Sequence, residues 1–420
     1  MAEYITDLHY HSKYSRAVSR DMDLEHLSVV ADIKGLHVVT AADFTHPAWF
    51  AELKKKLQLK SNGLYQLKNQ KICIHFMLTS EISCIYSQGG KTRRIHLVVI
   101  MPTLDAVEKF NGLLVSEGAN VKSDGRPIVG MSAEHIVELA QQADKDSLVI
   151  PAHIWTPWFS MFGSMSGFDT VEECFGKQTK NIYAIETGLS SDPPMNWRLS
   201  QLDKYSIVSF SDSHSPDKLG REATVMELES LSYKNIMAAL KQTSGKNKIA
   251  YTVEFYPEEG RYHWDGHAKC KVRLSPAETR KLKGICPKCK KPVTVGVLSR
   301  VGKLADRPEG YKPANRPPFK SLVPLREIIA ESIDQGVHTK RVTAEYDSIL
   351  AKGGNEFNIL LNLSIDELKK MTNPTIVEAI KRIREGKMSV EPGYDGEYGI
   401  VKLFTDAERK KYVVKQEKLL

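Results

Sequence analysis

The sequence predicts an α/β fold in which a barrel of strands and helices comes first. From the start to about residue 250, short apolar runs alternate with amphipathic stretches, which is the pattern of βα units. Between residues 251 and 305, His, Cys, Gly and Lys replace the long apolar runs. We therefore expect three parts: a barrel over 1–250, a small module over 251–305, and a linker with a helical region over 306–420.

Seven short apolar runs are the candidate strands, and their number suggests a closed barrel. They are Tyr4–His9, His37–Ala42, Ile72–Glu81, Ile95–Met101, Ser147–Ala152, Ile182–Ile185 and Ile207–Phe210. Between them, four segments carry apolar residues at helical spacing. These are Leu24–Lys34, Pro47–Leu59, Leu104–Glu117 and Ala133–Asp144.

The sequence predicts a linker followed by helices at the end of the chain. Ala305–Leu322 is rich in proline and basic residues, which predicts an extended loop. Beyond it, Ser364 with Glu367 and Thr405 with Glu408 have capping-box spacing, so a helix should start at each serine or threonine. The basic stretch 363–387 predicts two short helices, and we consider a role for them in binding duplex DNA.

Composition sets loose limits on function. The 420 residues carry a net charge of +8, which permits a partner with phosphates but does not require one. No apolar run is long enough to span a bilayer, and the first residues lack the pattern of a signal peptide. We expect a cytoplasmic protein, associated with the nucleoid if it binds DNA, without a membrane partner and with no protein partner identified.

Polar side chains recur where the predicted strands end. Asp7, His9 and His11 alternate, so they project to one side of a strand. Further acidic and imidazole groups end or follow the other strands, where the active site of a βα barrel lies. They are Asp43, His46, Glu81, His96, His153, Glu186, Asp212 and His214.

Such a set of imidazoles and carboxylates is the ligand chemistry of a cluster of zinc or manganese ions. Any single member has an ordinary alternative, since Asp and His often cap turns after strands. The paired spacing of His9 with His11 and of Asp212 with His214 favours metal binding. Five other histidines without such partners read as structural or surface residues: His26, His37, His75, His135 and His338.

These stretches resemble the PHP (polymerase and histidinol phosphatase) superfamily of metal-dependent phosphoesterases. The similar segments are "DLHYHS", "TSEIS", "RRIHLVVIMP", "PAHIW" and "SDSHSP". The resemblance implies a distorted (β/α)7 barrel with two or three divalent ions, which would be Zn, Mn or Mg. It implies one ion on His9, His11, Glu81 and Asp212, and a second on Glu81, His96 and His153.

The chain departs from the superfamily at the third ion. That site would use an acidic or imidazole group after the first motif, a histidine after the aspartate of the second, and His214. Arg16 and Phe44 stand at the first two positions, which leaves Asp43 or His46 as substitutes. Proton transfer would then fall to Asp43, His214 or Glu186.

A second constellation predicts a structural zinc ion. His267-x2-Cys270 is followed after fifteen residues by Cys286-x2-Cys289, a spacing typical of one tetrahedral site. His263 is the reserve ligand. Six lysines surround the site and would suit a phosphate backbone, or simply form a solvated face: Lys269, Lys271, Lys283, Lys288, Lys290 and Lys291.

Over nearly the whole chain, the sequence is similar to one branch of that superfamily, the endonuclease Q family of DNA repair nucleases. The similar strings include "DFTHPAWF", "SPDKLGREA", "DGHAKC", "CPKC", "VGKLADRPEG" and "EPGYDGEYG". The resemblance implies hydrolysis of the DNA phosphodiester 5′ to hypoxanthine (deoxyinosine), uracil (deoxyuridine), xanthine or an abasic site. The base would stay in place, and the products would carry 3′-hydroxyl and 5′-phosphate ends.

Aromatic residues beside His153 are the candidates for a lesion pocket, since enzymes that read damaged bases wall them with aromatic groups. They are Trp155, Trp158, Phe159 and Phe162, with a buried core as the equal alternative. Candidates for phosphate contacts near strand ends are Lys13, Arg16, Arg198 and Arg221.

Two other functions remain open. A PHP-type phosphatase of a small phosphomonoester would explain the barrel but not the zinc-binding module. A DNA-binding scaffold with a degenerate barrel is supported only by Arg16 and Phe44.

Overall fold

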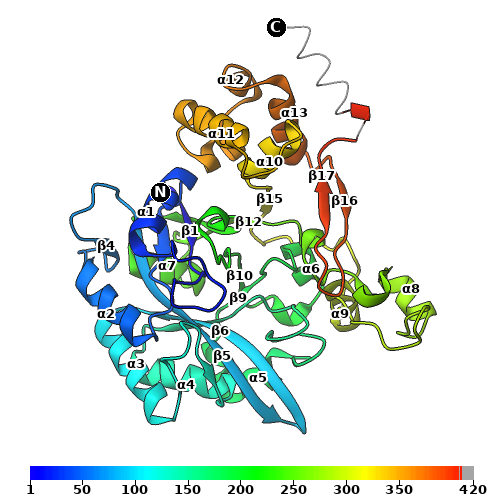
Figure 1. The fold of residues 1–420 in the computed structure, drawn as a ribbon. Helices are drawn as coiled ribbons and strands as arrows, with labels where there is room; N and C mark the ends of the chain where they lie inside the picture. The colour runs from blue at the N-terminus through cyan, green and yellow to red at the C-terminus, as the bar shows by residue number, and fades with distance from the viewer. Residues whose placement is uncertain (406, 409–420) are drawn as a thin grey trace.

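A computed structural model describes residues 1–405, 407 and 408, and it confirms the α/β class (Figure 1). The barrel portion contains nineteen named elements. They are β1 (Ala2–Asp7), α1 (Leu24–Lys34), β2 (Val38–Thr40), α2 (Pro47–Lys56), β3 (Leu57–Leu59), β4 (Tyr65–Leu67), β5 (His75–Gln88), β6 (Lys91–Met101), α3 (Leu104–Ser116), β7 (Ile128–Val129), α4 (Ala133–Ala143), β8 (Leu148–Pro151), α5 (Val171–Phe175), β9 (Ala184–Glu186), α6 (Pro193–Trp197), β10 (Ser206–Val208), β11 (Ala223–Leu228), α7 (Tyr233–Leu240) and β12 (Lys248–Glu254).

The main sheet is mixed, whereas the βα pattern predicted parallel strands. Parallel pairs join β1 to β2 and β2 to β5, but β5 and β6 form a long antiparallel hairpin. Gly89 and Gly90 both have positive φ at its tip, which is the conformation of a tight hairpin turn. Consequently Glu81 and His96 lie inside strands rather than at strand ends, with His96 opposite Ser83.

The barrel closes near the predicted site through irregular backbone contacts. β9 and β10 form a separate parallel pair. The segment after β10 then meets the segment after β1: Tyr10 bridges to Ser213, and the backbone N–H of Asp212 donates to the carbonyl of His9 over 2.8 Å. These contacts bring the first and last predicted ligand pairs together.

The helices follow the predicted positions closely. α1 has the expected bounds, with Asp23 capping its N-terminus and Gly35 in a left-handed conformation at its end. α2 stops at Lys56 rather than Leu59, because residues 57–59 pair with β4 instead. Pairing with β4 thus ends the helix three residues earlier than the apolar spacing predicted.

Beyond the barrel, the remaining helices and strands build the small module and the helical region. They are β13 (Asp265–His267), β14 (Val272–Leu274), α8 (Pro276–Lys281), α9 (Val297–Leu304), β15 (Phe319–Ser321), α10 (Leu325–Ser332), α11 (Lys340–Gly353), α12 (Ile365–Lys369), α13 (Pro374–Arg384), β16 (Ser389–Glu391) and β17 (Ile400–Lys402). A capping box at Ser364 opens α12 as predicted, and another at Ser275 opens α8. The Thr405–Glu408 hydrogen bonds also form, while the residues after 408 lie outside the described chain.

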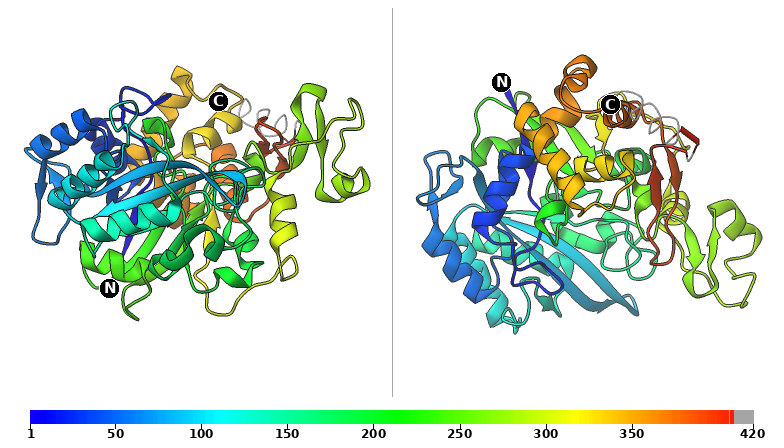
Figure 2. Two further views of the ribbon diagram at one scale, coloured as in Figure 1. Left: turned by 90° about the horizontal axis from the view of Figure 1, so that it is seen from below. Right: turned by 45° about the horizontal axis from the view of Figure 1, so that its top comes forward.

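The three sequence regions are interwoven. β12 crosses the boundary placed at residue 250, and β15 pairs with it in parallel. The hairpin of β16 and β17 returns to the module, where Gly393 accepts a hydrogen bond from the Trp264 backbone over 2.9 Å. Figure 2 shows the module projecting from one side of the barrel and helices α10–α13 packed at another. The division into domains stays a prediction. None of the described helices is both long and apolar enough to cross a bilayer.

Candidate metal centre

Two groups of potential metal ligands meet inside the barrel. His9, His11 and Asp212 form one group, and Glu81, His96 and His153 form the other. Within each group, one ligand atom of every residue lies within 4.8 Å of the others. Six of the seven predicted metal ligands are thus gathered from segments that span more than two hundred residues.

Glu81 connects the two groups. Its Oε2 lies 3.4 Å from His11 Nε2, while its Oε1 lies 3.6 Å from His9 Nε2. The same Oε1 is 2.6 Å from His96 Nδ1 and 3.1 Å from His153 Nε2. The carboxylate is completely buried and faces both groups, as expected for a ligand shared between two ions.

Each of the four histidines is held by a partner on the ring nitrogen that faces away from the centre. His9 Nδ1 lies 2.9 Å from Glu186 Oε1, and His11 Nδ1 lies 3.2 Å from Asp43 Oδ1. The partners of the other two rings are hydroxyls, with His96 Nε2 3.1 Å from Ser83 and His153 Nδ1 3.2 Å from Ser160. Such outer partners fix the tautomer and orientation of metal-binding imidazoles.

Asp43 and Glu186 therefore occupy orienting positions. Asp43 also accepts the backbone N–H of Ser12 and the hydroxyl of Ser15, and Glu186 accepts the backbone N–H of His153 over 2.8 Å. Both were sequence candidates for proton transfer. Their lone pairs are already engaged, so the geometry favours a role in holding imidazoles.

Charge in the centre also fits cations. Burial opposes protonation of His9, but the carboxylates of Glu186, Glu81 and Asp212 outweigh it and raise the pKa of His9 to about 10. Burial likewise opposes the protonation of His11, yet Asp43 and Asp212 raise its pKa to about 9. His9 Nε2 is buried without a hydrogen-bond partner among the described residues. The donors and this orphaned nitrogen suit divalent ions.

The backbone is strained where the site is built. Asp43, His153 and Asp212 have φ values of 57°, 30° and 44°, in the left-handed region that non-glycine residues rarely adopt. Residues in such conformations cluster at functional sites, because the fold must compel them. The three positions together mark this end of the barrel as functional.

Arg126 also lies at the centre, although no sequence pattern pointed to it. Its Nη1 donates to Glu81 Oε2 over 3.2 Å. Burial disfavours the charged guanidinium, but Glu81 and Asp212 raise its pKa. It comes from the loop before β7, between two elements that carry no other predicted ligand.

No third group of ligands forms in the described part of the barrel. His46 stacks on Tyr14 with ring centroids 4.5 Å apart, and Phe44 is fully buried beside Phe110. His214 sits at the rim with 36% of its side chain exposed, and its Nδ1 lies 3.0 Å from the carbonyl of Asp212. A metal-binding role for His214 stays a prediction.

The four aromatic candidates separate by burial. Trp155 and Phe162 are fully buried, and the indole of Trp155 donates to Asn196, as in a core. Phe159 is half-buried, has a φ of 60°, and its ring lies 4.7 Å from that of His96. Trp158 packs edge-on against Tyr262 of the module, with centroids 5.6 Å apart. Only the latter two remain near the opening.

The four residues predicted to contact phosphate differ in their exposure and in whether another group already pairs with them. Lys13 forms an ion pair with Glu52, and Arg221 donates to the carbonyls of Ser211 and Asp212, which supports the backbone of that ligand. Arg198 is half-buried. Arg16 has 75% of its side chain exposed and lies 3.6 Å from Asp124.

The four predicted ligands of the module come together, and a zinc ion there stays a prediction. His267, Cys270, Cys286 and Cys289 place their ligand atoms within 4.8 Å of one another, and His263 is outside this group. Each ligand pair is followed by a lysine with positive φ, 51° at Lys271 and 61° at Lys290. The two halves of the site thus repeat one turn geometry. Among the surrounding lysines, Lys288 and Lys290 donate to carbonyls of the module itself.

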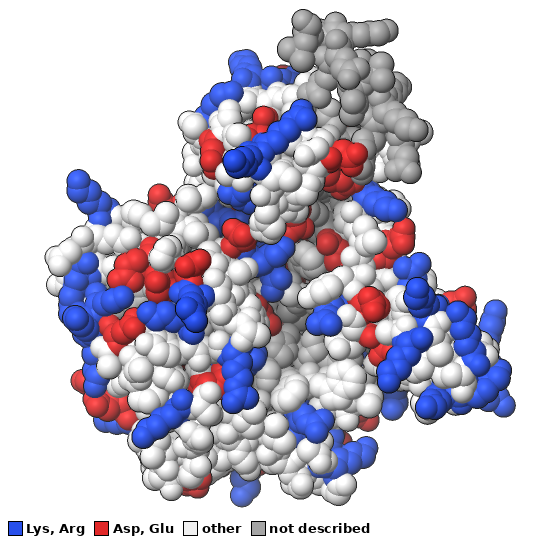
Figure 3. Space-filling model, in the orientation of Figure 1, with Lys and Arg blue, Asp and Glu red and all other residues white. Residues whose placement is uncertain are grey.

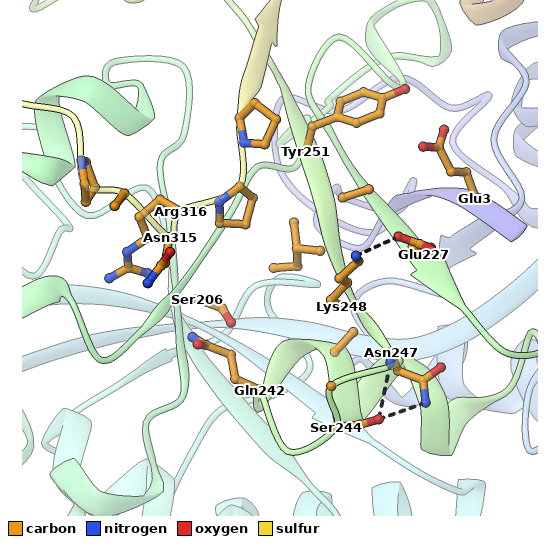
Figure 4. A pocket seen from close by; sticks show the side chains of 18 of the residues that line it. Glu3, Ser206, Glu227, Gln242, Ser244, Asn247, Lys248, Tyr251, Asn315 and Arg316 are labelled. Atoms are coloured by element: carbon orange, nitrogen blue, oxygen red, sulfur yellow. Dashed lines mark hydrogen bonds and ion pairs between the residues drawn. The ribbon is translucent and has the colours of Figure 1, made fainter. Parts of the chain in front are cut away.

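Two sizeable cavities lie away from these groups. One of about 980 Å³ is lined by the starts of β10 and β12 and by residues 313–318, at the barrel end opposite His9 and Asp212 (Figure 4). Another of about 760 Å³ lies between Lys218, Glu259, α10 and β17. Figure 3 shows a hollow where the barrel, the helical region and the module meet. The ligand geometry, rather than cavity size, therefore identifies the reactive site.

Solved structures are similar to this protein over almost its whole length. The lesion-specific endonuclease PfuEndoQ from Pyrococcus furiosus is 31% identical with a TM-score of 0.85, and the match covers 96% of this chain and 95% of that chain. Endonuclease Q in complex with a 27-mer duplex substrate, with an abasic lesion at the active site, is also 31% identical. Its TM-score is 0.86, with coverage of 99% and 100%.

Sequence comparisons agree in part. The uncharacterized protein YqxK of Bacillus subtilis (strain 168) is 28% identical over 96% of this chain and 100% of its own length. The uncharacterized protein MJ0043 of Methanocaldococcus jannaschii is 36% identical over 252 residues, 58% of this chain and 31% of that protein. The chain thus spans about a third of the latter. The family model of the MJ0043 C-terminal domain matches residues 324–387, which contain α10–α13.

The fold and the two joined ligand groups are those of a metal-dependent DNA endonuclease. With 31% identity over nearly the full length of both chains, this protein belongs to the endonuclease Q family of DNA repair endonucleases, and the resemblance read from its sequence is confirmed.

Proposed function

We propose that this protein cuts DNA on the 5′ side of a damaged nucleotide. The substrates would be duplexes with a deaminated base (hypoxanthine, uracil or xanthine) or an abasic site, and the base would not be removed. The observation that carries the proposal is the Glu81-linked pair of ligand groups, in a chain similar over 99% of its length to Endonuclease Q with an abasic duplex.

Two divalent ions fit the residues present. His9, His11 and Asp212 would hold one, His96 and His153 the other, and Glu81 would face both. When bound, such a pair lowers the pKa of water and stabilises an in-line displacement at phosphorus. Their identity as Zn, Mn or Mg is left to experiment.

The chain's own residues supply orientation and proton transfer. Asp43 and Glu186 keep the Nε2 atoms of His11 and His9 turned toward Glu81 and the centre. Water oxygen bonds to phosphorus as the P–O3′ bond breaks, and the departing 3′ oxygen takes up a proton. His214 is our candidate for moving that proton, because its partly exposed ring packs against that of His11 and only its Nδ1 has a hydrogen-bond partner among the described residues.

The half-buried aromatics next to the centre support lesion recognition. Phe159 contacts His96, so a base extruded beside the scissile phosphate would meet its ring. Trp158 and Tyr262 extend this aromatic surface onto the module. The exposed lysines of the module, Lys269, Lys271, Lys283 and Lys291, would then follow the DNA backbone.

The test uses labelled duplexes with a single deoxyinosine, deoxyuridine or abasic site, together with Mg²⁺, Mn²⁺ or Zn²⁺ and an undamaged control duplex. We expect one cut, immediately 5′ to the lesion, with a 3′-hydroxyl end. Cutting that ignores the lesion would reject lesion recognition. Hydrolysis of p-nitrophenyl phosphate without any cutting of DNA would instead favour the phosphatase alternative.

A further inference from the structure

Hydrogen bonds join the loop that carries Arg126 to two segments of the metal centre. Gly125 donates its backbone N–H to the carbonyl of Tyr14 over 3.1 Å, and its own carbonyl accepts the hydroxyl of Thr45, also over 3.1 Å. Asp124 accepts the backbone N–H of Arg126 over 3.1 Å. The loop is thereby tied to the segments that follow β1 and β2, which also carry His11 and Asp43.

The close approach of this loop requires glycine. A Cβ atom at position 125 would lie 2.5 Å from Ser15 Oγ and 2.7 Å from Asp43 Oδ2, well inside any real contact. Asp43 in turn orients His11. The backbone at residue 125 therefore lies directly behind a metal-binding group, and it fixes where the next side chain must go.

That side chain reaches the opening of the centre. Arg126 Nη1 lies 3.2 Å from Glu81 Oε2, and this oxygen is 3.4 Å from His11 Nε2. Glu81 is fully buried, whereas 24% of the Arg126 side chain is exposed. The guanidinium thus contacts the ligand groups and is also partly open to solvent.

The guanidinium of Arg126 has hydrogen-bond donors that are not used in this position. It carries five N–H groups in a planar fork, and within the described residues only Nη1 is engaged, with Glu81. Its charge and fork geometry match the paired oxygens of a phosphate. Lys13 and Arg221, by contrast, are committed to Glu52 and to backbone carbonyls.

We propose that Arg126 is a catalytic residue that binds a non-bridging oxygen of the scissile phosphate while Glu81 faces the ions. The proposal rests on the proposed function, because it assumes that a phosphodiester enters this centre. Arg126 adds positive charge where negative charge grows as the water oxygen bonds to phosphorus and the P–O3′ bond breaks. The competing interpretation is that Arg126 only neutralises Glu81.

The first experiment compares Arg126→Ala, Arg126→Lys and the control Lys145→Ala, which removes one charge from an exposed loop at the opposite end of the barrel. We expect Arg126→Ala to lower kcat/KM for incision on the order of 10²-fold, because lost transition-state donors have effects of that size. Arg126→Lys should recover only part, since lysine lacks the fork. Lys145→Ala should match the wild type, and all variants should retain the wild-type metal content.

A second experiment measures binding rather than turnover. Affinity is compared for lesion duplexes whose phosphate 5′ to the lesion is either a normal diester or a neutral methylphosphonate, in the slow Asp212→Asn background. Neutralising that phosphate should weaken DNA binding when Arg126 is present. It should have little effect on DNA binding in the Arg126→Ala variant. Guanidinium added below denaturing concentration should restore incision to Arg126→Ala, while urea should not.

The outcomes separate the two interpretations. Equal methylphosphonate effects with and without Arg126, no rescue by guanidinium, or loss of metal in Arg126→Ala would overturn the proposal in favour of charge neutralisation. If the wild type does not cut lesion duplexes but hydrolyses another phosphoester, the proposed function fails. Arg126 is then judged by the same variants on that substrate.

Discussion

Asp212→Asn tests the metal centre with little disturbance of the fold. Asp212 has a φ of 44°, and asparagine adopts this left-handed conformation as readily as aspartate does. The two side chains have the same shape, so the backbone contact to the carbonyl of His9 should persist. The substitution removes the negative charge shared by the two carboxylate oxygens, of which Oδ1 lies 3.1 Å from His11 Nε2 and 3.9 Å from His9 Nε2.

The size of the effect follows from this geometry. Asp212 is the one carboxylate in its ligand group, so the ion held there keeps two imidazoles and a share of Glu81. Stabilisation by such an ion amounts to several kcal/mol. A loss of about 3 to 4 kcal/mol corresponds to roughly 10²- to 10³-fold in rate at 1.36 kcal/mol per tenfold change. DNA affinity should change little, because Asp212 is a metal ligand rather than a phosphate contact.

The assay combines metal analysis, single-turnover incision of a deoxyinosine duplex, and fluorescence anisotropy for binding. The matched control is Asp217→Asn, which removes the same charge from an exposed position in the same loop and should cut normally. Weakened DNA binding with full metal content would refute the reasoning, as would wild-type incision by the Asp212 variant.

Three further predictions address the surroundings of the centre. Cys286→Ser should release the structural zinc, unfold the module and weaken DNA affinity; zinc analysis and anisotropy check this, and unchanged affinity would contradict it. Glu186→Gln should lower metal affinity by roughly 10- to 100-fold, as losing the outer partner of a metal-binding imidazole does. Chelator competition measures it, and normal metal affinity with slow incision would instead make Glu186 a proton-transfer group. Burial, aided by Asp192, raises the pKa of Glu254 from 4.5 to about 8. The stability that the neutral carboxyl contributes to the fold is therefore fully present below about pH 4.5 and is lost as pH rises through 8. Glu254→Gln should therefore gain thermal stability relative to wild type between pH 6 and pH 9, and parallel Tm profiles would contradict this.

The strand-end pattern found the ligands because it depends on local chemistry. His9, His11 and Asp212 follow short apolar runs, and such runs show where strands end without any knowledge of the topology. Apolar runs alone do not predict the hairpin of β5 and β6, because the turn between them is marked by Gly89 and Gly90 rather than by apolar spacing. The ligands were found nevertheless, since strand alternation within a hairpin also presents alternate residues to one side.

Other features depend on tertiary contacts that no sequence spacing expresses. Arg126 stands 45 positions from Glu81, in a loop whose only pattern is an Asp-Gly turn. Its position follows from how Gly125 packs against Asp43. Similarly, the aromatic run after His153 left core and pocket equally supported, and only burial assigns Trp155 and Phe162 to the core.

Hydrogen bonds join the module to the loop that carries Phe159, so a metal ion bound in the module would also affect this loop. Arg300 of α9 is buried and donates to the carbonyls of Phe162 and Phe168, 2.8 Å each, while Ser164 donates to the carbonyl of Val295. These bonds hold the part of the loop that follows Phe159, whose ring lies beside His96. Because buried charged donors leave costly unsatisfied groups when displaced, the loop and the module should order together. A metal ion in the module would then also stabilise the loop that carries Phe159.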